Sequence, residues 1–209
     1  MRETGFQLAA DHLKLGIQEI YRQLANDSAR NAGIIDDVIS AVQEGRSPIL
    51  LTERKDHLEY LAGRLQGFVR HLIVLQGGMT AKAQHRSADQ LASIPDTTKR
   101  LVLATGRYIG EGFDDARLDT LFLAMPVSWK GTLIQYSGRL HRHHAAKTAV
   151  RIYDYVDREV PMLLRMFEKR IATYRAIGYA RGEAPLGFTE PLEVVEYDQE
   201  ALRHFEEDP

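Results

Sequence analysis

Two arginines, Arg139 and Arg142, have the residue type and spacing that most directly suggest chemistry. Side chains three residues apart on a helix share one face, so both guanidinium groups can point at a single anion. The planar guanidinium matches the oxygens of a phosphate or a carboxylate. Gly138 directly precedes Arg139 and would keep this face low enough for close approach. The segment therefore predicts a helix that faces a phosphate-bearing ligand.

A second candidate segment combines glycines with a carboxylate. An apolar run ends at Thr105 and is followed by Gly110, Gly112 and Asp114. The glycines allow a tight turn with main-chain amides near a phosphate. Asp114 offers a carboxylate to a ribose hydroxyl or to a facing domain, and the Thr105 hydroxyl could donate to a nucleic-acid phosphate. The alternative is a glycine-rich loop that binds no ligand.

Two further apolar runs, at 49–51 and 69–75, are also followed by polar residues or glycine. Thr52 and Arg54 come directly after the first run, and Gly78 and Thr80 come after the second. Side chains and amides at these places could contact a nucleic-acid backbone without reading bases. Two alternatives stay open: Arg54 could form a surface salt bridge with a neighbouring acid, and Thr80 could cap a helix.

The elements that would position these residues alternate between helix and strand. Apolar periodicity and turn residues predict helices at 34–44, 58–65, 78–92, 130–142 and 160–174, and strands at 49–51, 69–75, 100–104, 121–124 and 149–155. Short apolar runs without alternation are typical of strands that are covered on both faces. The order predicts an α/β fold with a mostly parallel sheet and helices on both faces. In such sheets the functional loops lie beyond the carboxyl ends of the strands.

Four of these segments, in this order, resemble conserved motifs of superfamily 2 helicases and translocases. The QxxGRxxR pattern of motif VI occurs at 135–142, and segments similar to motifs IV, IVa and V occur at 49–54, 75–86 and 103–114. The chain thus resembles the C-terminal RecA-like lobe of a DEAD/DEAH-type, restriction-helicase-like enzyme. That resemblance implies a RecA-like fold and a motor lobe of an ATP-dependent nucleic-acid helicase or translocase.

The resemblance also implies roles for individual residues. Arg142 would be the arginine finger, Arg139 its neighbour on the γ-phosphate, and Gln135 a contact near the attacking water or between lobes. The remaining ATP-cleft residues would be Gly110, Gly112, Asp114 and Gly138. The nucleic-acid contacts would be Thr52, Arg54, Gly78, Thr80 and Thr105.

The triphosphate-binding half of such an enzyme has no counterpart in this sequence. Neither a GxxxxGK[ST] phosphate loop nor an Asp-Glu dipeptide occurs. We therefore expect ATP and Mg²⁺ to be bound mainly by a first RecA-like lobe, in the same longer protein or in trans, and the isolated chain to be inactive. An excised domain explains this better than a stand-alone remnant. The partner would be DNA or RNA, which the motifs do not distinguish. An interaction module that keeps the fold without catalysis is the alternative function, and another kind of nucleotide-binding enzyme is a more distant one.

Composition sets the remaining bounds. The 209 residues are 44% hydrophobic and 27% charged, with no cysteine, which suits a globular, soluble and cytoplasmic protein without a membrane span. We expect no metal site, because the neighbouring histidines at 141, 143 and 144 point in different directions on a helix. Residues 183–209 carry nine acidic residues and one arginine. We divide the chain into a lead-in helical segment at 1–30, the RecA-like domain at 31–180 and an acidic tail at 181–209.

Overall fold

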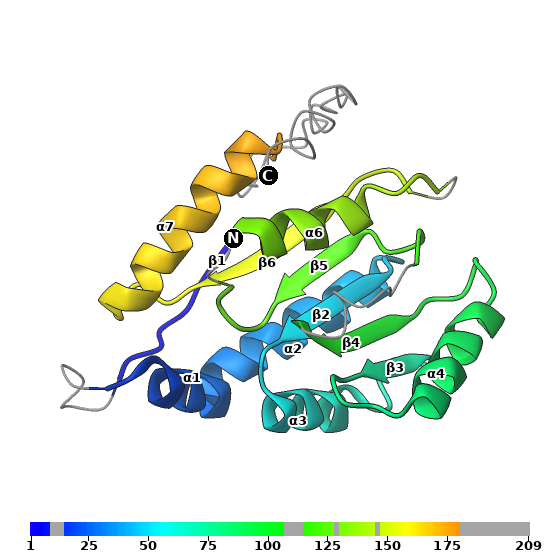
Figure 1. Cartoon of the computed structure of the whole chain (residues 1–209), viewed down its shortest axis with the longest axis horizontal. Helices are drawn as coiled ribbons and strands as arrows, with labels where there is room; N and C mark the ends of the chain where they lie inside the picture. Colours follow the sequence, from blue (N-terminus) through cyan, green and yellow to red (C-terminus); the bar gives the residue numbers. More distant parts are fainter. Residues whose placement is uncertain (9–14, 107–114, 128–129, 145–146, 180–209) are drawn as a thin grey trace.

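The structure is a computed structural model, described for residues 1–8, 15–106, 115–127, 130–144 and 147–179 (Figure 1). Its centre is one sheet of six strands in the order β1-β6-β5-β2-β4-β3, and every registered pair is parallel. The strands are β1 (Arg2–Glu3), β2 (Pro48–Thr52), β3 (Leu72–Leu75), β4 (Leu101–Thr105), β5 (Thr120–Leu123) and β6 (Arg151–Val156). The predicted parallel sheet is confirmed.

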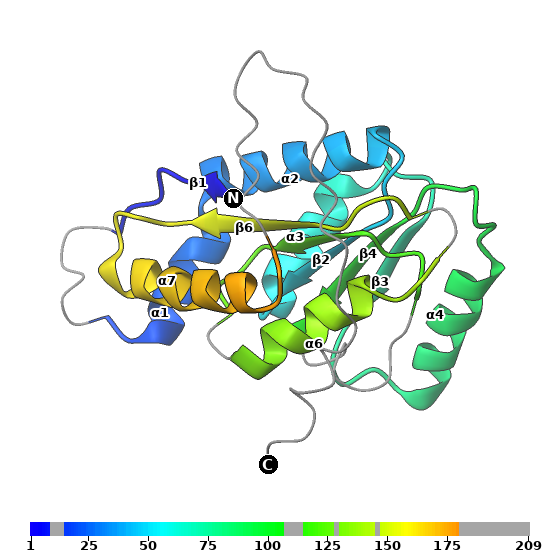
Figure 2. The same ribbon diagram turned by 90° about the horizontal axis from the view of Figure 1, so that it is seen from above.

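Helices cover both faces of this sheet (Figure 2). They are α1 (Ile17–Asn26), α2 (Ser28–Gln43), α3 (Lys55–Leu65), α4 (Ala81–Ser93), α6 (Lys130–Leu140) and α7 (Pro161–Ala176). Side chains of β2 alternate between two cores. Leu50 packs with α2 and α3 on one face, whereas Ile49 and Leu51 pack with α4, α6 and α7 on the other. Burial on both faces explains why these strands are continuous apolar runs.

Element boundaries differ from the sequence prediction at several ends. Helix α2 begins at Ser28 rather than at residue 34, because the carboxylate of Asp27 accepts the amide of Arg30 at 2.7 Å and caps the helix. Strand β1 was not predicted: only two residues long and exposed, it carries no apolar pattern. The predicted boundary between the lead-in segment and the RecA-like domain, after residue 30, falls inside α2. The predicted tail at 181–209 is outside the described residues.

Candidate functional site

Several of the predicted site residues meet at the carboxyl ends of neighbouring central strands. Thr52 of β2 pairs in register with Thr105 of β4, so the ends of these strands lie side by side. The Thr105 hydroxyl accepts the amide of Gly77, at 2.9 Å, from the turn that follows β3. The structure therefore brings together the ends of β2, β3 and β4, as the parallel topology requires.

Lys55 is a candidate contact that the sequence pattern did not select. Gly78 has φ +83°, a conformation that favours glycine. A Cβ atom built on Gly78 would lie 3.7 Å from the Nζ of Lys55, so the ammonium lies next to this turn. Lys55 is exposed and begins α3. A cation beside a glycine turn is suited to binding a phosphate. The signal available in the sequence was the position of Lys55 shortly after the end of a predicted strand.

The side chain of Thr52 is buried and engaged inside the protein. Its Oγ1 lies 3.0 Å from His57 Nδ1, and His57 Nε2 lies 2.9 Å from Asn31 Oδ1. The Asn31 amide nitrogen donates to the carbonyl of Ala25 at 2.8 Å, so Asn31 Oδ1 is the acceptor and His57 carries its proton on Nε2. The Thr52 hydroxyl then donates to Nδ1. Any contact of Thr52 with nucleic acid must therefore come from its main chain.

His57 stays neutral in this chain of hydrogen bonds. Burial, followed by the positive charge of Arg30, lowers the pKa of His57 from its ordinary 6.5 to about 3. A neutral imidazole both donates and accepts, which the two neighbours require. The network ties α2, α3 and the end of β2 into one rigid unit beneath the loop that carries Arg54 and Lys55.

The two open alternatives for Arg54 and Thr80 are the arrangements found in the structure. Arg54 binds Asp56 through Nη2 to Oδ2 at 2.6 Å and Nε to Oδ1 at 3.0 Å. Thr80 caps α4 by accepting the amide of Ala83 at 3.3 Å. A surface ion pair stabilises little, so Arg54 could exchange Asp56 for a phosphate at small cost. The Thr80 hydroxyl keeps its proton for a second bond.

The phosphate-facing segment is positioned by α6 and the turn after it. Gln135 and Gly138 are exposed, Arg139 is half-buried, and Arg142 is exposed. No heavy atom of the described residues, apart from the helix's own backbone and the chain neighbours, lies within 4 Å of a Cβ built on Gly138. This surface is thus open for close approach.

The prediction of one helix from 130 to 142 is wrong at its end. Helix α6 stops at Leu140, and Arg142 lies in the bend that follows. The amide of His141 is shared between the carbonyls of Ser137 and Gly138, both at 3.3 Å, as is common where a helix ends. Arg139 and Arg142 therefore do not lie on one continuous helical face.

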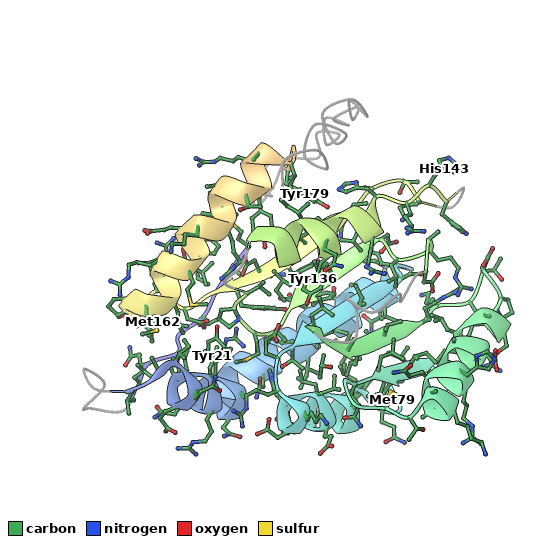
Figure 3. All side chains as sticks on the ribbon, viewed as in Figure 1. Tyr21, Met79, Tyr136, His143, Met162 and Tyr179 are labelled. Carbon is green, nitrogen blue, oxygen red and sulfur yellow. The ribbon has the colours of Figure 1, made fainter. Side chains whose placement is uncertain are left out.

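Two side chains hold the turn that carries Arg142. The ammonium of Lys147 donates to the carbonyl of Leu140 at 2.6 Å and to that of Arg142 at 2.8 Å. Burial lowers the pKa of Lys147. On the other side, the Tyr179 hydroxyl lies 2.8 Å from His141 Nε2, next to the end of α6 (Figure 3). Both lie outside the QxxGRxxR motif, so sequence reasoning missed them.

Three predicted ATP-cleft residues, Gly110, Gly112 and Asp114, lie outside the described residues. Within the described ranges, no group of three His, Cys, Asp or Glu side chains could hold a metal ion. No helix in the same ranges is long and apolar enough to cross a membrane.

Comparison with known proteins supports the fold. No family model matches the chain. It is 24% identical over 157 residues to the transcript termination protein A18 of Fowlpox virus (strain NVSL), which covers 72% of this chain and 33% of that protein. UvsW of T4 superposes with a TM-score of 0.63 and 18% identity, covering 78% of this chain and 35% of UvsW. The C-terminal domain of the DEAD-box protein Dbp5 gives a TM-score of 0.52 and 18% identity, covering 70% and 79%.

These likenesses define the class of fold. The chain has a RecA-like α/β fold similar to the C-terminal domain of the DEAD-box protein Dbp5 and to part of UvsW, as the motif order implied. It spans about one third of the length of the A18 protein and of UvsW.

Proposed function

We propose that this chain is the C-terminal motor lobe of an ATP-dependent nucleic-acid helicase or translocase, with Arg142 as its arginine finger. The observation that carries the proposal is the arrangement at the end of α6. Gln135 and Gly138 are open to solvent there, and Arg142 lies on a turn that Lys147 holds by its main chain. UvsW of T4 superposes on 78% of this chain.

The chemistry asked of this surface is the stabilisation of negative charge. ATP supplies the phosphoryl group, and Mg²⁺ offsets charge on its phosphates. An arginine presented across a domain interface to the γ-phosphate contributes on the order of 10³ to 10⁵ in rate. The donor set here consists of Arg139, Arg142 and the amide of Gln135, which fits an anion. Because the sequence contains no phosphate loop, ATP and Mg²⁺ would be held chiefly by a first lobe, in the same longer protein or in trans.

A DNA or RNA strand would lie along the ends of β2, β3 and β4. Lys55 and Arg54 supply positive charge, and the turn at Gly78 lets a phosphate approach the main chain. Thr80 supplies a hydroxyl, and Thr105 holds the Gly78 turn against β4 through Gly77. Such contacts position a strand without reading its sequence.

The strand-binding part is testable with this chain alone. We expect a fluorescent single-stranded oligonucleotide to bind weakly, with an affinity that falls as salt increases. Lys55→Ala should weaken binding and reduce the salt slope by about one counterion. The matched control is Lys99→Ala. Lys99 is exposed, donates to the carbonyl of Gln43, and lies just before β4, at the amino end of that β-strand. Equal losses in both variants would show that the strand does not follow the proposed track.

The catalytic part needs both lobes. We expect the isolated chain to hydrolyse no ATP, and an assembly with its first lobe to hydrolyse it in response to nucleic acid. An interaction module that only keeps the fold predicts strand binding together with an ATPase rate that does not depend on Arg142.

A further inference from the structure

Three segments of the proposed site touch at one point. Glu53 follows β2, Gly106 follows β4, and Tyr136 lies on α6. A Cβ atom built on Gly106 would lie 2.5 Å from Glu53 Oε1 and also 2.5 Å from the Tyr136 hydroxyl oxygen. Both oxygens thus press against the same glycine, and no larger residue fits there without displacing them.

The two side chains that approach Gly106 differ in burial. Tyr136 is buried and belongs to the core between α6 and the sheet, as its place beneath α6 shows (Figure 3). Glu53 keeps contact with solvent, yet the protein around its carboxyl raises its pKa. Burial first, and then the Glu53 charge, raise the pKa of Tyr136, while the Arg139 charge acts in the opposite direction. The charges of Glu53 and Arg139 thus act in opposite directions on the pKa of the Tyr136 hydroxyl.

Among the described residues, Tyr21 on α1 is a further titratable group that the charge of Glu53 influences. Burial raises the pKa of Tyr21 to about 12, and the charge of Glu53 contributes to this rise. The Tyr21 hydroxyl donates to the carbonyl of Pro126 at 3.1 Å, next to the end of β5. Glu53 thus lies at the carboxyl edge of the sheet, between α6 and the strand-binding loop, which is the name we give to Arg54 and Lys55.

Glu53 connects two surfaces that the proposed function keeps apart. Along the chain it is followed directly by Arg54 and Lys55, the cations of the strand-binding loop. Across space its carboxyl approaches the same glycine, Gly106, as the hydroxyl of Tyr136, which lies one helical turn before Arg139. The side chains of Glu53 and Tyr136 therefore share the space beside Gly106, and a change at one bears on the room left for the other.

We propose that Glu53 is a positioning residue that couples the strand-binding loop to α6, setting the place of Tyr136 and, through it, of Arg139. The coupling rests on the proposed function, since it gives a route from bound nucleic acid to the arginines at the ATP cleft. Gly106 has no Cβ, which leaves room beside it for both the Glu53 and the Tyr136 oxygens.

The position carries a stability cost that a purely structural residue would avoid. Because the folded-state pKa of Glu53 is raised, its contribution to stability is fully present below the unfolded pKa and is lost as pH rises through the folded one. At neutral pH the partly desolvated carboxylate therefore destabilises the fold. Glu53→Gln should consequently raise the melting temperature at pH 7, with a gain that disappears below the ordinary glutamate value of 4.5.

The test follows the Arg139 Nε–Hε signal by ¹⁵N NMR as a function of pH in the 209-residue chain. In the wild type we expect this signal to shift with a midpoint above 4.5, the ordinary value for glutamate. Glu53→Gln should abolish the shift. The matched control Glu59→Gln removes the same charge from an exposed residue of α3 and should leave the shift intact. A Glu53→Gln variant whose Arg139 signal still titrates as in the wild type overturns the proposal.

Two further measurements separate this proposal from the function on which it rests. Tyr136→Phe, which removes only the hydroxyl, should move the midpoint of the Glu53 carboxyl measured by ¹³C NMR, and an unmoved midpoint contradicts the coupling of the two side chains. Addition of a single-stranded oligonucleotide should shift the Arg139 signal in the wild type and in Glu59→Gln, but not in Glu53→Gln. A wild-type chain that binds no strand contradicts the strand track and the coupling, while the pH titration still decides whether Glu53 positions α6.

Discussion

The Nζ atom of Lys147 lies 2.8 Å from the main-chain carbonyl oxygen of Arg142 and donates a hydrogen bond to it. A second bond, of 2.6 Å, goes to the carbonyl of Leu140, where α6 ends. The same ammonium thus closes the helix and fixes the turn that follows. In the proposed motor lobe, the direction of the arginine finger depends on this lysine.

We expect Lys147→Met to lower turnover in the two-lobed assembly and to leave strand binding unchanged. Methionine keeps the apolar stem but donates no hydrogen bond, so the turn loses its fixed geometry. A loss of about 1.4 kcal/mol in transition-state stabilisation corresponds to a tenfold fall in kcat. Steady-state ATPase would measure kcat and KM separately.

Lys147→Arg should recover part of the rate, and Lys169→Met, at an exposed position of α7, should have no effect. A change in KM without a fall in kcat would contradict a role of Lys147 in positioning the finger.

Stability should depend on pH through His57. Because burial lowers the folded-state pKa to about 3, the unfolded chain binds this proton more tightly than the folded one. The contribution of His57 is therefore complete above 6.5 and is lost as pH falls towards about 3. The loss is on the order of 1 kcal/mol per pH unit in this window. Urea unfolding at several pH values would measure it.

The pH dependence has a direct control. His57→Gln should lower stability at pH 7 and flatten its dependence on pH between 6.5 and 3. His85→Gln, at an exposed position of α4, should keep the wild-type slope. Identical slopes in all three proteins would show that His57 is not buried as a neutral group.

The buried pair of Arg170 and Asp154 should dominate the attachment of α7. Arg170 donates to both carboxylate oxygens of Asp154, at 2.7 and 2.8 Å, and the Tyr174 hydroxyl donates to one of them at 2.8 Å. Asp154→Asn leaves a buried guanidinium without its counter-charge, and such changes cost about 3–5 kcal/mol. Chemical denaturation should show this loss. Asp36→Asn, on the exposed side of α2, is the control and should stay close to the wild type.

The sequence predicted the fold well because two patterns were strong. The apolar runs of β2, β4 and β5 are buried on both faces, so they carry an unmistakable strand signal. The order of the motifs then indicated which RecA-like lobe was present. Strand β1 was missed because two exposed residues carry no pattern.

The parts of the site that sequence reasoning missed depend on contacts between distant residues. Nothing local shows that the Thr52 hydroxyl is engaged by His57, or that Lys147 ends α6 at Leu140. Glu53 and Tyr136 are far apart in the chain, and the parallel pairing of β2 with β4 places Glu53 beside Gly106, which the Tyr136 hydroxyl also approaches. Motifs predicted which residues face ligands, whereas the supporting contacts required the structure.

The central claim is that Arg142 acts on charge that develops during phosphoryl transfer. It is tested by steady-state ATPase of Arg142→Ala in the two-lobed assembly with saturating nucleic acid, paired with nucleotide affinity from fluorescence titration. We predict a fall in kcat on the order of 10³ with little change in nucleotide affinity, poor rescue by Arg142→Lys, and unchanged strand binding. An Arg142→Ala protein that keeps its kcat, or that loses strand binding while hydrolysing ATP normally, would contradict the assignment of this turn to the ATP cleft.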